Sequence, residues 1–363
     1  MNREEAIKDF KNKKAKQFVD ECDKLLTELF DKNRDKIKEI LMQSLENIVK
    51  KAEISHKRKE DRITTFQIEI LRTEILTESF KICVHGYNIF GYLDESPICE
   101  YVNLKFLFEP LMQLKEKLEK EKKIYIGKIN SYDIQNMLLK IAVEFYISLA
   151  NEVRQWLWNL EECEWIKNEC VNNFYQIRWG EYHGKSEIVF AMDNRKKSSA
   201  DFLQLKTQEE AKMPFVYTVW KDSILNNCEI KNRNMLFISF KGSILEQIKF
   251  LGCKMLSSQF DNSNIKKCSF EESILIASSF KKSQLDLCSF QRTNLFGVDF
   301  SNAKLTNINF NNSNLAKTNF INVEVENLSF ENADVSDAVF SSKVVPFLHL
   351  SPEQLQTIYI MED

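Results

Sequence analysis

Between residues 240 and 340 the apolar positions of the chain follow one strict period. Phenylalanine stands at every tenth position, and a large aliphatic residue stands midway between each successive pair. Leu225, Ile230 and Met235 extend this five-residue period toward the N-terminus. A period of five fits neither an α-helix nor a β-strand, so neither element is predicted here. The phenylalanines of the repeat are Phe240, Phe250, Phe260, Phe270, Phe280, Phe290, Phe300, Phe310, Phe320, Phe330 and Phe340.

Small and polar residues follow the same period. Two residues before each apolar centre the side chain is mostly that of Ser, Thr, Cys or Ala, and one residue before the centre Asn or Asp is common. Residues 293–297 and 313–317 carry the whole pattern. It resembles the pentapeptide-repeat family, and the resemblance covers residues 223–345.

The resemblance implies a right-handed, quadrilateral β-helix, a solenoid in which four units make one coil of twenty residues. At twenty residues per coil, residues 223–345 would make about six coils, stacked at the inter-strand spacing of about 4.8 Å. Phe240 and Phe260 would then lie one above the other in an internal ladder, and Phe250 and Phe270 in a second. We expect the small residues before each centre to let the chain turn its corners without Gly and Pro, of which it has only 8 and 5.

Two features of this solenoid allow more than one interpretation: the cysteines of its interior and the segment at its C-terminal end. Four cysteines fall at the small inward position, where we expect buried fillers; a metal or redox pair at Cys268 and Cys288 is the alternative. Over residues 346–363, Ser351 and Gln354 predict a helix that begins with a capping box. In several pentapeptide-repeat proteins the comparable segment joins two solenoids, so the helix either forms a homodimer or caps a monomer.

Residues 1–175 show a different pattern. Ile37, Leu41, Leu45 and Ile48 follow the three-four spacing of a long helix, and similar spacing runs through residues 60–90, 98–122 and 131–175. The pattern predicts an N-terminal helical bundle. Residues 176–222 are predicted to be a hairpin and linker segment, because two apolar runs flank a polar turn that contains Gly184.

Few residues of the chain suggest a catalytic, phosphate-binding or metal-binding site. The segment 180–186 lacks the first Gly of a phosphate-binding loop, since Trp179 stands there. Cys163, Cys170 and His183 lack the close spacing of zinc ligands, and His85 is expected near a helix end. We therefore predict no catalytic residue, no cofactor, no metal site and no enzyme activity. Tryptophans suggest either a partner surface or an inter-domain interface, and the candidate partner surface consists of Trp156, Trp165 and Trp179.

Composition narrows the functional classes. The chain of 363 residues has 50 Lys and Arg against 53 Asp and Glu, a net charge of -3, which argues against direct binding of nucleic acid. Nine cysteines without a dense framework favour a reducing compartment. The N-terminus lacks the apolar run of a signal peptide, and no apolar stretch of about 18 residues occurs. These features predict a cytoplasmic protein without membrane association.

Three functions remain open. The first is a non-enzymatic scaffold or regulator that presents the solenoid, next to a helical recruitment module, to a protein partner whose identity the sequence does not give. The second follows from the family resemblance: protection or inhibition of DNA gyrase or topoisomerase IV by mimicry of DNA. From Ser223 onward, 15 acidic and 13 basic residues leave a net charge of only -2, which speaks against that mimicry. The third is an accessory subunit of a peptide-modifying or defence enzyme system.

Overall fold

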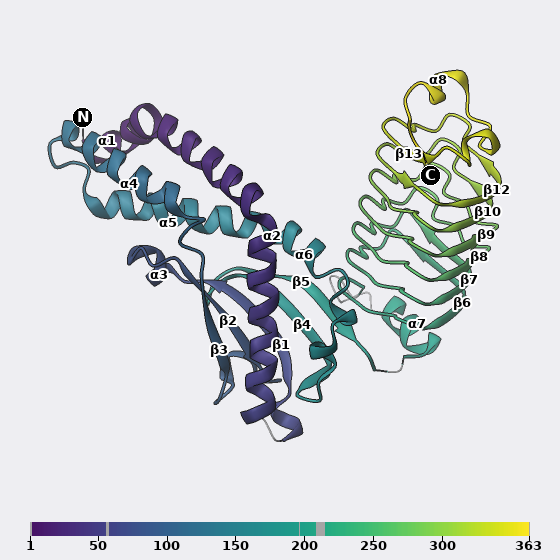
Figure 1. Ribbon diagram of the computed structural model, residues 1–363, viewed down its shortest axis with the longest axis horizontal. Helices are drawn as coiled ribbons and strands as arrows, with labels where there is room; N and C mark the ends of the chain where they lie inside the picture. The colour runs from purple at the N-terminus through teal and green to yellow at the C-terminus, as the bar shows by residue number, and fades with distance from the viewer. Residues whose placement is uncertain (1, 56–57, 196, 208–214, 363) are drawn as a thin grey trace. The chain divides into compact units, whose positions relative to one another are not determined.

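The chain divides into two compact units, Met1–Met192 and Asp193–Asp363 (Figure 1). The computed structural model describes residues 2–55, 58–195, 197–207 and 215–362. Residues 208–214 of the predicted linker therefore lie outside the described residues. No described helix combines the length and the apolar character needed to cross a membrane.

A five-stranded mixed sheet forms the centre of the first unit, with the strand order β3-β2-β1-β4-β5. β1 pairs antiparallel with β2 and parallel with β4, and β2 pairs antiparallel with β3. The hairpin of β4 and β5 closes through a turn in which Gly184 N–H donates to the Glu181 carbonyl at 3.0 Å. The strands are β1 (Ile63–Ile70), β2 (Lys81–Tyr87), β3 (Ile98–Asn103), β4 (Val171–Glu181) and β5 (Ser186–Asp193).

One face of this sheet packs against helices. Gly86 lies so close to α2 that a Cβ atom there would approach Ile48 to 2.7 Å. On β4, the buried Trp179 stacks on Tyr146 of α5, with ring centroids 4.0 Å apart. The α-helices of this unit are α1 (Arg3–Asp9), α2 (Lys16–Ser55), α3 (Arg72–Leu76), α4 (Glu109–Glu121), α5 (Ser131–Ser148) and α6 (Ala150–Trp156), and a π-helical turn (Phe10–Ala15) lies between α1 and α2. Short 3-10 helices follow at Lys59–Asp61, Gly91–Leu93, Lys122–Tyr125, Leu160–Glu162 and Glu164–Lys167.

The expectation of a helical bundle over residues 1–175 is therefore corrected. The long helix α2 is present, but residues 63–70, 81–87 and 98–103 form strands. β1 alternates apolar and polar residues with a period of two and is rich in β-branched residues, which suits a sheet with one apolar and one polar face. His85 accordingly lies within β2 and not near a helix end.

The second unit is a β-solenoid of about seven turns, which confirms the predicted class of fold. Residues twenty apart pair in parallel along its whole length, from Val219 with Ser239 to Val339 with Tyr359. The count exceeds the expected six coils because pairing begins before residue 223 and a strand at the C-terminus adds a last rung. One side forms a parallel sheet of β6 (Ile224–Lys231), β7 (Ile244–Leu251), β8 (Asn264–Lys266), β9 (Gln284–Asp286), β10 (Lys304–Asn309) and β12 (Glu324–Ser329).

Two stacks of phenylalanine rings fill the solenoid interior. Neighbouring rings within a stack lie 4.5 to 5.4 Å apart between centroids, and their planes are inclined by no more than 26°. Rings of different stacks meet mostly edge to face, as Phe280 and Phe290 do at 5.8 Å. Both geometries suit the quadrupole of the aromatic ring.

The small inward residues bind adjacent coils together. Ser263 Oγ donates to the Phe240 carbonyl at 2.7 Å, and Ser278 Oγ donates to the Met255 carbonyl at 2.8 Å. Each donor lies 23 residues after its acceptor, one coil further along the solenoid. These side chains thus satisfy buried backbone carbonyls in addition to saving space.

The corners of the solenoid lie at a position that the sequence analysis did not select. From Tyr217 to Asp337 every fifth residue has a positive φ, between 51° and 71°. These residues follow the apolar centre by two, whereas we expected the small residue before the centre to make the corner. Asn occupies nine of the positions and Gly three. Asn tolerates the left-handed conformation better than most residues, so the solenoid turns with few glycines.

Two of the corner glycines have different surroundings, so we expect their replacement by alanine to lower the free energy of unfolding by different amounts. A Cβ on Gly297 would meet nothing within 4 Å, whereas a Cβ on Gly242 would lie 2.2 Å from Asp222 Oδ1. We expect Gly297→Ala to lower the free energy of unfolding by about 1 kcal/mol through backbone strain alone. Gly242→Ala is expected to cost more, because Asp222 must move as well. Urea unfolding of both variants checks the order, and equal losses would contradict it.

Short caps cover both ends of the solenoid. In α7 (Ser199–Thr207), the buried Phe202 packs edge to face on Trp220 and Phe240. At the other end the helix predicted over residues 346–363 is shorter than expected: α8 covers only Pro352–Leu355, although it begins with the expected capping box of Ser351 and Gln354. The chain then continues into β14 (Tyr359–Met361), which pairs with β13 (Val339–Ser341), itself beside β11 (Asn319–Phe320). A homodimer through this segment stays a prediction.

Candidate functional site

The sheet face opposite to α2 carries a polar cluster around a buried carboxylate. Glu69 of β1 has a fully buried side chain. Its Oε2 lies 2.8 Å from His85 Nδ1, and its Oε1 accepts from Tyr92 Oη at 2.9 Å and from Gln67 Nε2 at 2.8 Å. His85 is the one basic group at ion-pair distance from Glu69 among the described residues. A buried carboxylate needs such partners, since burial penalises its charge.

Aromatic rings fix the orientation of His85. The imidazole stacks on Tyr87 at 5.1 Å and on Tyr182 at 5.9 Å between centroids. His183, in the β4–β5 turn, stacks on Tyr92 at 4.5 Å. The rings therefore come from β2, from the loop after β2 and from the hairpin turn, which together line the polar face.

Two cysteines lie at the edge of this cluster. Cys83 Sγ is 3.5 Å from His85 Nε2, and the sulfur of Cys99 on β3 completes a group whose possible ligand atoms all lie within 4.8 Å of one another. Cys83 is buried and Cys99 is exposed. Burial, together with Cys99 and Glu69, raises the pKa of Cys83 to about 12. In the absence of a cation Cys83 is thus a neutral thiol at neutral pH.

Sequence reasoning missed this cluster because it read the segment as helix. On a strand, Cys83 and His85 point to the same face, since side chains alternate. Antiparallel register then places Cys99 opposite His85 and Glu69 opposite Cys83. The available signal was the Cys-x-His spacing within a run of period two.

The three tryptophans of the predicted partner surface have different environments. Trp179 is 1% exposed, and its Nε1 donates to the Tyr146 carbonyl at 2.7 Å, so it belongs to the core; its place in a partner surface is corrected. Trp156 is half-buried and stacks on Phe30 of α2 at 5.9 Å. Trp165 is half-buried and lines a groove beside Tyr101. A partner surface at Trp156 and Trp165 stays a prediction.

The remaining cysteine candidates have structural contacts. Cys268 and Cys288 are buried, and each thiol lies within hydrogen-bond distance of a carbonyl of the preceding coil, at 3.5 and 3.4 Å. Burial raises the pKa of both thiols, that of Cys268 to about 11. Cys170 donates to the Val49 carbonyl of α2 at 3.5 Å. These contacts favour a packing role for the three residues.

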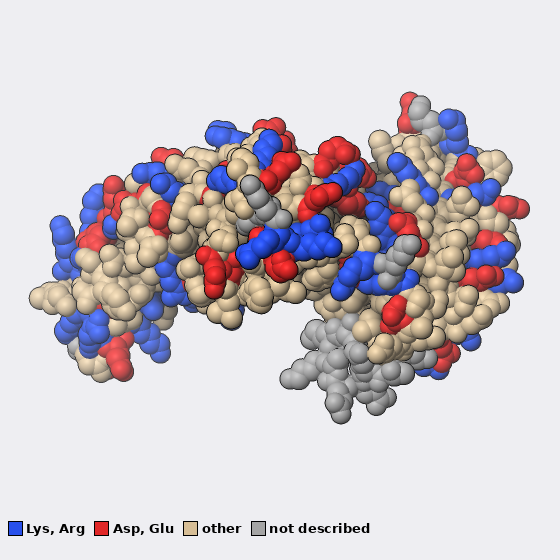
Figure 2. Space-filling model, turned by 90° about the horizontal axis from the view of Figure 1, so that it is seen from below, with Lys and Arg blue, Asp and Glu red and all other residues tan. Residues whose placement is uncertain are grey.

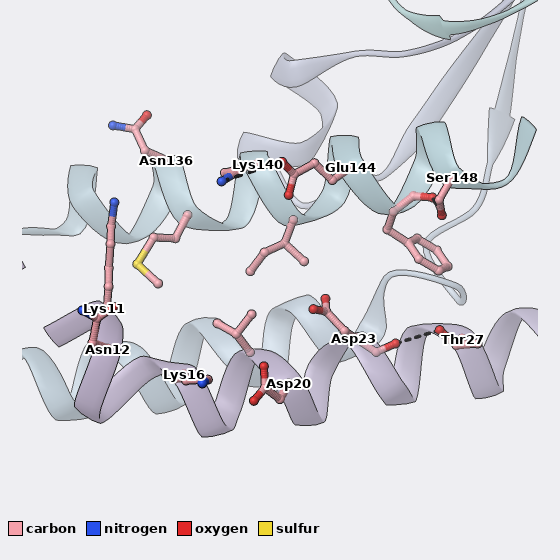
Figure 3. A pocket seen from close by; sticks show the side chains of 14 residues that line it. Lys11, Asn12, Lys16, Asp20, Asp23, Thr27, Asn136, Lys140, Glu144 and Ser148 are labelled. Carbon is pink, nitrogen blue, oxygen red and sulfur yellow. Dashed lines mark hydrogen bonds and ion pairs between the residues drawn. The ribbon is translucent and has the colours of Figure 1, made fainter. Parts of the chain in front are cut away.

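A groove of about 740 Å³ runs between the N-terminal part of α2 and α5 (Figure 3). Val19, Met137 and Ile141 are among its apolar lining residues. Carboxylates and lysines stand around it, and burial with the neighbouring Asp20 and Glu144 raises the pKa of Asp23. The charged side chains around this groove have both signs and do not point toward one common position. The groove therefore does not indicate the chemistry of a ligand.

The outer surface of the solenoid differs between its sides. Most residues that directly follow an apolar centre are at least partly exposed, and on one side four such residues, one coil apart, are all apolar. Their rungs are joined directly, because the carbonyls of residues 256, 276 and 296 accept from the backbone of residues 237, 257 and 277 at 2.9 to 3.0 Å. We call this set the apolar stripe: Leu236, Leu256, Ile276 and Phe296.

The other sides carry mainly polar residues at the equivalent positions, and both signs of charge occur. Arg292 pairs with Glu272 at 2.9 Å, and Lys281 pairs with Asp299 at 3.1 Å. Figure 2 shows one face of the protein on which basic and acidic residues are interspersed. These ion pairs, and the 15 acidic and 13 basic residues from Ser223 onward, give the described surface of the solenoid a mixed charge.

A protein-family model matches part of the repeat. Residues 263–340 match the family model for the pentapeptide repeat region. The solved structures that resemble the chain include a pentapeptide repeat protein from the thylakoid lumen of Arabidopsis thaliana, with 26% identity over 26% of this chain and 67% of that chain, at a TM-score of 0.19. They also include a trypsin-treated form of the plasmid-mediated fluoroquinolone resistance protein QnrB1, with 14% identity over 42% and 86% of the two chains, at a TM-score of 0.19.

A third similar structure is HetL from the cyanobacterium Nostoc sp., a pentapeptide repeat protein involved in the regulation of heterocyst differentiation. It is 11% identical over 40% of this chain and 98% of its own, at a TM-score of 0.13. No curated protein matches the chain.

The second unit is a repeat domain built from stacked coils. More particularly, its five-residue period and the family match make it a pentapeptide-repeat solenoid, as the sequence predicted. The family match lies wholly within this second unit.

Proposed function

We propose that the protein is a non-enzymatic interaction scaffold whose solenoid binds a protein partner along the apolar stripe. The stripe is the observation that carries the proposal. Leu236, Leu256 and Ile276 are half-buried, and Phe296 is 38% exposed. Contiguous apolar surface rimmed by polar residues is typical of protein–protein contact sites.

The rigidity of the solenoid supports this function. Every coil is fixed to its neighbours by backbone pairing and by stacked rings, so the stripe is held in one geometry before a partner arrives. A preformed surface loses little conformational entropy on binding, which favours affinity. The nine free cysteines fit action in a reducing compartment such as the cytoplasm.

A charge placed on the apolar stripe is expected to weaken partner binding. We expect Ile276→Lys to weaken binding at least about tenfold, the effect of losing a contact worth more than about 1.4 kcal/mol. Gln291→Lys is the matched control, because residue 291 occupies the equivalent outward position on another side. The partner is captured from a host extract with a photocrosslinker at position 276 and titrated against both variants.

Two results would contradict the proposal. One is a crosslinker at position 276 that captures no protein. The other is a partner whose affinity falls equally in Ile276→Lys and Gln291→Lys. Unchanged supercoiling by gyrase across fluoroquinolone concentrations, in the presence of the purified chain, would separately count against the protective role that the family resemblance implied.

A further inference from the structure

We propose that Cys83, His85 and Cys99 form a zinc site on the polar face of the first unit's sheet. The site is independent of the solenoid and of its partner. Cysteine thiolates and imidazole are ligand types that zinc prefers, and binding here would release the thiol protons of Cys83 and Cys99 to solvent. All three come from the paired strands β2 and β3, so the sheet itself holds them in place.

The distances suit a tetrahedral ion. With Zn–S bonds of about 2.3 Å and Zn–N bonds of about 2.0 Å, sulfur and nitrogen ligands lie about 3.5 Å apart. Cys83 Sγ and His85 Nε2 are 3.5 Å apart, and the whole group lies within 4.8 Å. Binding therefore requires Cys99 to approach by at most about 1 Å. Cys99 is the exposed member of the group, and rotation about its χ1 angle moves its sulfur.

Glu69 acts as the positioning residue of this site. Zinc-binding histidines usually donate their second ring N–H to a carboxylate, which fixes the tautomer and raises the basicity of the ligating nitrogen. Glu69 Oε2 lies 2.8 Å from His85 Nδ1, which leaves Nε2 directed toward Cys83. Tyr92 and Gln67 in turn hold the other carboxylate oxygen. A merely structural histidine would not need this chain of orienting contacts.

The burial of Cys83 favours a metal ligand over a catalytic thiol at this position. Cys83 lies 3.5 Å from His85 and has no exposed surface, which disfavours direct attack of its sulfur on a substrate. A cation bound by both sulfurs would instead explain why a buried carboxylate and a buried thiol stand beside one imidazole. The exposed edge at Cys99 leaves room for a fourth ligand from solvent, as in zinc sites with an open position.

Cobalt titration of the reduced, full-length chain tests the site. We expect one Co²⁺ per chain, with thiolate-to-cobalt charge-transfer absorption in the near ultraviolet and the visible bands of a tetrahedral ion; Zn²⁺ should displace it. The Cys99→Ser and His85→Gln variants, which each lose a ligand, should bind Co²⁺ more than 100-fold more weakly than the unmodified chain. Loss of a residue that only orients a ligand usually lowers metal affinity by about 10- to 100-fold. We expect the Co²⁺ affinity of Glu69→Gln to fall by a factor within that smaller range.

Cys163→Ser is the control, because Cys163 is a half-buried cysteine outside the cluster and its loss should leave the cobalt spectrum unchanged. Circular dichroism establishes that each variant is folded. Absence of cobalt binding, or binding that Cys99→Ser does not weaken, would overturn the proposal. So would peptide mapping of the freshly isolated protein that finds Cys83 and Cys99 joined in a disulfide, which would make the pair a redox site.

Discussion

Replacing Phe290 by alanine is expected to lower the free energy of unfolding of the solenoid by about 3 to 5 kcal/mol, the usual cost of truncating a buried phenylalanine. Phe290 is fully buried and stacks on Phe270 at 4.8 Å and on Phe310 at 5.4 Å. It also meets Phe280 and Phe300 edge to face. Because all four neighbours are fixed by their own coils, the cavity cannot collapse without disturbing adjacent rungs.

Hydrogen–deuterium exchange of peptides from the solenoid, along a urea series, measures this loss in the unit concerned. Phe296→Ala is the matched control, since Phe296 is 38% exposed and lies only six residues further along the chain. We expect it to cost less than about 1 kcal/mol, as surface substitutions usually do. Similar losses for the two variants would mean that the stacked rings contribute little beyond exposed ones.

The solenoid could be predicted because its repeat is local. Each apolar centre points inward in every unit, so a period of five is visible without knowledge of any distant contact. The corners escaped the prediction for a related reason. Asn302, Asn307 and Asn312 stand at left-handed positions, but Asn is common throughout the repeat and its backbone role is not apparent from composition.

The first unit was harder because its decisive contacts are long-range. β1 pairs in parallel with β4, more than a hundred residues further along the chain. The period of two in residues 63–70 and 81–87 was nevertheless a local signal. The three-four spacing of apolar residues favoured helices in the sequence analysis, although apolar alternation was the stronger indication of a strand.

The candidate metal site depends on both kinds of information. The spacing of Cys83 and His85 is local, but only the register of three strands brings Glu69 and Cys99 to them. A search for zinc ligands by close Cys-x-x-Cys spacing therefore passes over the site. Ligands contributed by neighbouring strands need no sequence proximity, since the sheet sets their distance.

Replacing Trp179 by alanine is expected to destabilise the first unit by about 3 to 5 kcal/mol. The side chain is 1% exposed, stacks on Tyr146 at 4.0 Å and joins the sheet to α5 through its hydrogen bond to the Tyr146 carbonyl. Trp179→Phe keeps an aromatic ring and loses the donor, so its cost should be smaller, about 1 to 3 kcal/mol. Urea unfolding followed by far-ultraviolet circular dichroism gives both values.

Trp165→Ala separates packing from recognition in the same experiment. Trp165 is half-buried in a surface groove, and we expect its removal to cost less stability than either substitution at Trp179. If Trp165 contributes to a partner surface, its alanine variant should lose binding while remaining folded, because large half-exposed aromatic residues are typical binding hot spots. A loss of stability as large as that at Trp179 would instead assign Trp165 to the core. In that case a loss of binding would follow from unfolding and would not show a binding role.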